Sequence, residues 1–93
     1  MDRNKLIKSR RKIDDIDNRI FSLIKKRTKI VKTFLKIKDN KKQIVDKKRI
    51  KEILSKIKKK SIKHKVDATV TNRIWKEIIW SYVDFQKRKF KKK

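Results

Sequence analysis

One segment constrains the fold of this chain more than any other: residues 10–38 carry an apolar stripe at helical spacing that cations interrupt. At about 100° per residue, the apolar side chains share one face of a single long helix. They are Ile13, Ile16, Ile20, Leu23, Ile24, Val31 and Phe34. The same projection places Arg27 and Lys38 in the middle of this face and Arg10 at its edge. Because a buried unpaired charge is costly, these cations predict an anion that meets them.

The rest of the chain is also patterned for helices, which predicts an all-α fold with a long, a short and a medium helix and no strand. The long helix should absorb the polar residues 1–9 and end near Lys38, before a loop at 39–43. The short helix begins near Asp46 as N-cap, and its apolar side carries Ile50, Ile53, Leu54 and Ile57.

A second polar connection is expected at residues 61–65, followed by a third helix with Asp67 as its N-cap. The stripe of this helix consists of Val70, Ile74, Ile78, Tyr82 and Gln86, flanked by Trp75 and Ile79. The cationic tail at 87–93 should fray.

The length of 93 residues allows a single domain, 1–93, that buries only a modest core by itself. There is no Cys, so no disulfide is expected. The one His has no partner ligand at metal spacing, so no metal site is expected either, and no cofactor is expected. A helix of roughly 30 residues, about 45 Å long, cannot bury its stripe within so short a chain. It should therefore pair with a second copy.

The formal charge of +24 suggests a nucleic-acid partner. However, 26 of the 34 basic residues are Lys, the predicted helices carry cations on all faces, and no recognition motif appears. Nucleic-acid binding beyond non-specific attraction is therefore not expected. The absence of Gly also disfavours phosphate-binding loops. No apolar run approaches a membrane span and no signal-peptide pattern precedes residue 10, which favours a soluble cytoplasmic protein.

The spacing of the inward cations indicates the size of the anion. Arg27 and Lys38 are separated by about three helical turns, roughly 16 Å, so two long side chains could bracket a small dianion. Arg10 lies about 25 Å from Arg27 on the same rod and cannot reach that ligand. An antiparallel partner helix could supply a second Arg10. The spacing thus predicts a site shared between subunits.

Other polar residues extend this site without adding an obvious acid or base. The short helix offers Asp46 and Arg49 near its start, and the third helix offers Gln86 on an apolar face. No Ser/His/Asp triad, carboxylate pair or Cys nucleophile is apparent. Such a site suits a reaction that needs substrate orientation and stabilisation of developing negative charge.

In order and spacing, these residues resemble the all-helical (AroQ-type) chorismate mutases. The matching pattern is R-x-x-I-D-x-I-D-x-x-I from Arg10, then L-I-x-x-R ending at Arg27, then Lys38 eleven residues on. It continues through V-D-K-K-R at 45–49 and I-W-K-E-I-I at 74–79 to Gln86, which is nearly the whole chain.

The resemblance implies an intertwined homodimer with two equivalent sites and the Claisen rearrangement of chorismate to prephenate, a step of aromatic amino-acid biosynthesis in the shikimate pathway. Arg27 and Arg10 of the partner subunit would bind the two carboxylates, and Lys38 would contact the ether oxygen and a carboxylate. Gln86 would donate to the ether oxygen. Arg49 and Asp46 would line the pocket, with Asp46 near the ring hydroxyl.

Two positions depart from the mutase pattern. Ile50 replaces the Glu that usually follows the Arg of the short helix, and Tyr82 replaces a Ser one turn before the Gln. Both residues resemble the isochorismate pyruvate-lyases of the same family, which release pyruvate from isochorismate and form salicylate. Tyr82 is therefore included among the candidate substrate-binding residues, and both substrates remain open.

Two further interpretations also remain. A basic helical nucleic-acid-binding protein would bind DNA or RNA in a strongly salt-dependent manner that an Arg27→Ala change leaves unaffected. A catalytically inactive family member kept as a dimeric regulator would fit the missing Glu.

Overall fold

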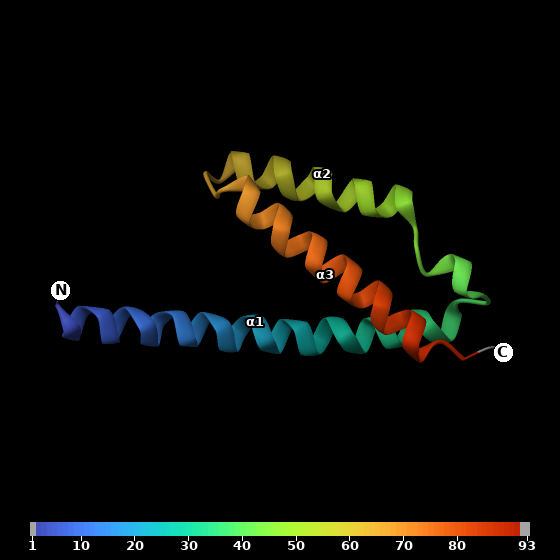
Figure 1. The fold of residues 1–93 in the computed structure, drawn as a ribbon, viewed down its shortest axis with the longest axis horizontal. Coiled ribbons are helices and arrows are strands. Elements are labelled where there is room, and N and C mark those ends of the chain that lie inside the picture. The colour runs from blue at the N-terminus through green and yellow to red at the C-terminus, as the bar shows by residue number, and fades with distance from the viewer. Residues whose placement is uncertain (1, 92–93) are drawn as a thin grey trace. The chain divides into compact units, whose positions relative to one another are not determined.

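A computed structural model describes residues 2–91, which form α-helices, one short 3-10 helix and no strand. The predicted all-α class and its order of long, short and medium helices are confirmed (Figure 1). The chain divides into two compact units, Met1–Thr33 and Phe34–Lys93. The expectation of one domain over 1–93 stays a prediction.

The long helix α1 spans Arg3–Ile37 and so absorbs the polar lead-in, as expected. Its first turn is capped by the Asp2 carboxylate, which accepts from the backbone N–H groups of Asn4 and Lys5 at 3.0 and 3.2 Å. Val31 is the buried residue of α1. Most of the predicted apolar stripe is exposed in the single chain; these residues include Ile13, Ile16, Ile20, Leu23 and Phe34.

The loop predicted at 39–43 contains the 3-10 helix η1, Lys41–Gln43. Asn40 caps η1 by accepting from the N–H of Lys42 at 3.0 Å, and the Gln43 side chain accepts from the N–H groups of Asp39 and Asn40. This reciprocal capping box orders the loop between α1 and the next helix.

Helix α2 spans Lys47–Lys63 and begins after Asp46, whose carboxylate accepts from the N–H of Arg49 at 3.0 Å. The predicted N-cap is thus confirmed. The predicted end of α2 is wrong, because residues 61–63 are still helical. Ser61 is buried, and its hydroxyl donates to the Ile57 carbonyl at 2.7 Å and lies 2.7 Å from the Thr71 hydroxyl. These bonds satisfy a polar side chain that sequence polarity alone assigns to a loop.

A tight turn joins α2 to helix α3, Ala68–Lys89 (Figure 1). Lys65 has a positive φ of 56° in this turn, and the Val66 N–H donates to the Ser61 carbonyl at 2.9 Å. The Asp67 carboxylate then accepts from the N–H groups of Thr69 and Val70 at 2.8 and 3.0 Å, which confirms the second predicted N-cap.

Helices α2 and α3 pack on each other and hold most of the core of the second unit. The buried apolar residues there are Ile44, Ile79 and Val83. The expected stripe of α3 is only partly correct, because Val70 and Ile74 are 52% and 47% exposed. The tail also differs from expectation, since α3 continues through Lys89; the end of the predicted fraying segment, 92–93, lies outside the described residues.

Between residues 2 and 91, no helix combines the length and the apolar character that crossing a membrane requires.

Candidate active site

Two residues that are far apart in the sequence meet in the second unit. Lys38 directly follows the last residue of α1, and Gln86 lies in the C-terminal half of α3. The Lys38 Nζ donates to the Gln86 Oε1 at 2.7 Å. Gln86 is only 7% exposed and Lys38 is half-buried. The structure therefore joins two of the predicted catalytic residues in one charge-assisted hydrogen bond.

This bond fixes the orientation of the Gln86 amide. An ammonium can only donate, so the Gln86 oxygen must face Lys38 and the amide nitrogen must face elsewhere. The Nε2 donates to the Tyr82 carbonyl at 3.2 Å, one helical turn back. An amide nitrogen carries two hydrogens, which leaves Gln86 one donor for a ligand.

The surroundings of Lys38 act on its charged form in opposite directions. Burial lowers the pKa of Lys38, and the nearby carboxylate of Asp46 opposes this effect. The Lys38 Nζ also lies 5.9 Å from the ring centroid of Phe34, within cation–π range. The sequence analysis placed Phe34 only in the apolar stripe; its position four residues before Lys38 was the signal that could have indicated this contact.

The start of α2 places the next two candidates differently. Asp46 caps α2 and acts on Lys38 through its charge. Arg49 is exposed, and its guanidinium lies 3.7 Å from the Glu52 carboxylate one turn along. The structure thus associates Asp46 with the Lys38–Gln86 pair and engages the Arg49 side chain on the surface of α2.

Tyr82 is half-buried on the same side of α3 as Gln86. Its ring meets that of Phe85 edge to face, with centroids 6.3 Å apart. Its carbonyl holds the Gln86 amide, so the backbone at this position helps to orient the predicted donor.

The remaining two candidates belong to the first unit, Met1–Thr33. Arg10 is exposed and Arg27 is half-buried, and both are helical residues of α1. Their predicted approach to the anion that Lys38 binds stays a prediction.

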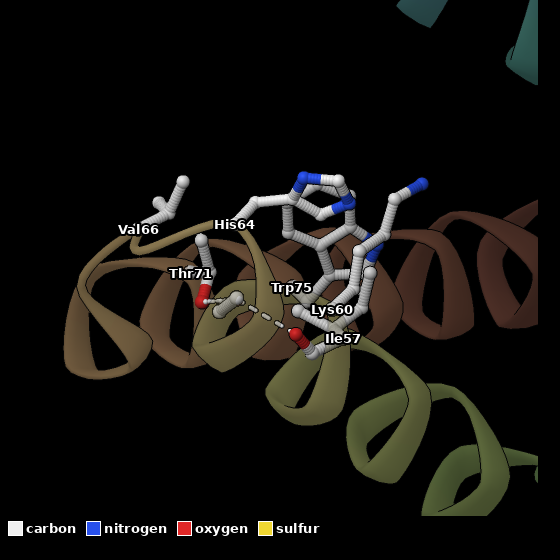
Figure 2. Close-up of a pocket in the computed structure, with 7 residues that line it drawn as sticks. Ile57, Lys60, His64, Val66, Thr71 and Trp75 are labelled. Atoms are coloured by element: carbon white, nitrogen blue, oxygen red, sulfur yellow. Dashed lines mark hydrogen bonds between the residues drawn. The ribbon is translucent and has the colours of Figure 1, made fainter.

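A pocket of about 250 Å³ opens elsewhere in the second unit, near the turn between α2 and α3. Figure 2 shows the His64 and Lys60 side chains beside the Trp75 ring, and a dashed line marks the hydroxyl pair at Thr71. None of the predicted site residues lines this pocket, which is mostly apolar.

The Lys38–Gln86 pair provides donors and positive charge and lacks an evident nucleophile. Within residues 2–91, no group of His, Cys, Asp and Glu could hold a metal ion. A half-buried ammonium beside an oriented amide favours a ligand that carries or develops negative charge on oxygen, because hydrogen bonds to ions strengthen where water is excluded.

Comparison with known proteins agrees with this chemistry. No curated protein and no solved structure matches the chain. A family model described as chorismate mutase type II matches residues 9–87, a range that contains every candidate site residue named above. This chain therefore belongs to the chorismate mutase type II family.

Proposed function

We propose that this chain is a chorismate mutase that converts chorismate to prephenate. The observation that carries the proposal is the 2.7 Å bond from Lys38 to a Gln86 amide that retains one donor hydrogen. Membership of the chorismate mutase type II family supplies the substrate class, a dianion with an ether oxygen.

The proposed mechanism needs no covalent step. In the Claisen rearrangement, the ether C–O bond breaks while a new C–C bond forms, and negative charge develops on the ether oxygen. Lys38 and the second hydrogen of Gln86 would donate to that oxygen. Because the donors are already oriented, each could lower the barrier by roughly 3 kcal/mol.

The two substrate carboxylates need further cations. In this proposal Arg27 binds one carboxylate and Arg10 of the partner subunit binds the other. Asp46 contacts the ring hydroxyl, and Arg49 and Tyr82 line the pocket. Since Arg49 and Glu52 are exposed, screening by water makes their ion pair weak, and a dianion could displace Glu52.

A homodimer follows from the same proposal. The apolar stripe of α1 is exposed in the single chain, with Ile13 at 55% and Leu23 at 62%. Such a stripe is the kind of surface that a second copy buries. Mixing the variants Arg10→Ala and Lys38→Met tests the shared site, since each heterodimer would contain one intact site. Mixtures should recover about a quarter of the wild-type activity; no recovery would argue against sites built from both subunits.

The activity itself is tested by incubating the protein with chorismate and measuring prephenate. Lys38→Met and Gln86→Leu should each reduce kcat/KM by roughly 10²- to 10³-fold. Lys42→Met removes an exposed lysine of the 3-10 helix η1 and serves as the control. No turnover of chorismate by the folded wild-type protein would contradict the proposal, and no turnover of isochorismate either would favour a non-catalytic dimeric regulator.

A second candidate is isochorismate pyruvate-lyase activity, favoured by Ile50 and Tyr82. The half-buried Ile50 gives α2 an apolar side chain where many mutases carry a Glu, and Tyr82 lies one turn before Gln86. The same incubation with isochorismate distinguishes the two reactions. Formation of salicylate and pyruvate at a higher kcat/KM than prephenate from chorismate would replace the first proposal with the second.

A further inference from the structure

Helix α2 is the most densely cationic of the α-helices in the described part of the chain. Over its 17 residues α2 carries nine Lys or Arg side chains and one carboxylate. α1 carries thirteen cations and three carboxylates over 35 residues, and α3 carries five and two over 22. Positive charge is thus concentrated on the shortest of these α-helices.

The packing of α2 explains why five of these cations share one side. Its other side faces the core and carries Ile50, Ile53, Leu54, Ile57 and Ser61, all half-buried or buried. By helical projection, five lysines lie on the opposite arc, and all five are exposed. We call this surface the α2 lysine face: Lys48, Lys51, Lys56, Lys59 and Lys63.

The charge of the α2 lysine face has little compensation from its own helix. Glu52 is the one carboxylate of α2; it lies on the same arc as the five lysines and 3.7 Å from the guanidinium of Arg49, at the edge of the face. Lysines of the face are neighbours at helical spacing, such as Lys56 with Lys59 and Lys59 with Lys63. Like charges at this spacing destabilise a helix, so a bound polyanion would relieve the repulsion.

We propose that the α2 lysine face binds the phosphodiester backbone of a nucleic acid. The helix is a rod of about 25 Å, and a duplex presents one phosphate charge per roughly 1.7 Å, so α2 can lie along about fifteen of them. Lysines act as mobile point charges, which suits contacts to the backbone and gives no base recognition.

Two features favour this ligand and separate it from the candidate active site. The outward arc carries one large apolar side chain, Ile62 at 64% exposure, which is too little to insert into a lipid surface. The face lies on the opposite side of α2 from the buried Ser61 and excludes Asp46, Arg49 and Lys38. Nucleic-acid binding is therefore a second activity that does not depend on the proposed reaction.

The net charge of +24 attracts any polyanion, so the test must separate location from total charge. One variant combines Lys48→Gln, Lys51→Gln, Lys56→Gln and Lys59→Gln in the face. The control combines Lys8→Gln, Lys12→Gln, Lys76→Gln and Lys87→Gln, which are exposed lysines dispersed over α1 and α3. Both proteins have the same net charge, and circular dichroism checks that both remain helical.

Fluorescence anisotropy measures binding of a labelled DNA duplex of about 20 base pairs and of a single-stranded RNA of similar length across a salt series. We expect the face variant to bind about 10-fold or more weakly than the wild type. The slope of the logarithm of the binding constant against the logarithm of the salt concentration should also become shallower by about 3. The control should lose less than about 3-fold.

Equal losses in the two variants would overturn the proposal, because the total charge and not the α2 lysine face would then control binding. So would an absence of wild-type binding to both probes, or tighter binding to phosphatidylcholine–phosphatidylglycerol vesicles than to either probe. If the face variant weakens binding of only one of the two nucleic acids, the result would support the proposal and identify the preferred backbone. Since no turnover is measured, failure here is distinct from failure of the proposed function.

Discussion

The hydrogen bond between Lys38 and Gln86 makes a prediction about stability that requires no substrate. Lys38→Met removes the donor and leaves the oxygen of a 7% exposed amide without the bond measured at 2.7 Å. Gln86→Leu removes the acceptor from a half-buried ammonium and also the 3.2 Å bond to the Tyr82 carbonyl. If the two side chains interact as described, their effects on the free energy of unfolding must be coupled.

The size of the coupling follows from the geometry. A hydrogen bond to a charged group contributes about 1.5–3 kcal/mol, and partial exposure of Lys38 places this one near the lower end. We expect Gln86→Leu to cost about 2 kcal/mol and Lys38→Met about 1 kcal/mol, since losing the ammonium also removes its desolvation. The double variant should be less destabilised than the sum by about 1–2 kcal/mol.

Urea unfolding followed by circular dichroism measures these values, at one protein concentration because assembly shifts apparent stability. The control pairs Gln86→Leu with Lys42→Met, which removes an exposed lysine and should be additive. Additivity of Lys38→Met with Gln86→Leu within about 0.5 kcal/mol would refute the claim that this bond joins the two residues.

Three other predictions test the site and the helix ends. Burial lowers the pKa of Lys38 below its ordinary 10.5, so the unfolded chain binds more protons than the folded chain between the lowered pKa and pH 10.5. The free energy of unfolding should therefore rise with pH in that window, while activity falls. A Lys38→Met protein that shows the same rise in stability would contradict this explanation. Lys65→Gly should raise the free energy of unfolding by about 0.5–1 kcal/mol, because Gly adopts the positive φ without strain. The control, Lys59→Gly within α2, should lower the free energy of unfolding by about 1 kcal/mol. Equal effects of the two changes would be inconsistent with the positive φ at Lys65. Asp67→Ala should lower the free energy of unfolding, measured with urea, by about 1 kcal/mol, because Asp67 caps α3. Asp84→Ala should lower it by less than about 0.5 kcal/mol, because Asp84 pairs with Arg88 on the surface. The reverse order would argue against the cap.

Helix existence and two of the helix starts could be predicted from the sequence because their signals are local. Asp46 and Asp67 each precede an apolar period, and each carboxylate caps the helix that follows. The end of α2 could not be predicted in this way. The polarity of Ser61 predicts a loop residue, yet its hydroxyl contacts that of Thr71 on α3, which makes Ser61 part of the buried face.

The candidate site was only partly accessible from spacing. Lys38 and Gln86 are 48 positions apart, and the resemblance to a known family first paired them; the 2.7 Å bond is a property of the fold. The pKa shift of Lys38 depends on packing and on the distance to Asp46, which no sequence pattern encodes. The exposed Val70 and Ile74 show the limit of periodicity, which identifies an apolar face without identifying what covers it.

The caps have a consequence for how this sequence can evolve. The chain contains neither Gly, which commonly ends a helix, nor Pro, which is common in the first turn of a helix. Here three aspartates, Asp2, Asp46 and Asp67, mark the helix starts, and Asn40 marks the 3-10 helix. Mutations can exchange many exposed lysines at little cost in stability. The chain has only ten acidic residues, and the capping positions among them tolerate only side chains that accept a backbone hydrogen bond. Substitution in a lineage should therefore be fast along the helix surfaces and slow at these four capping positions.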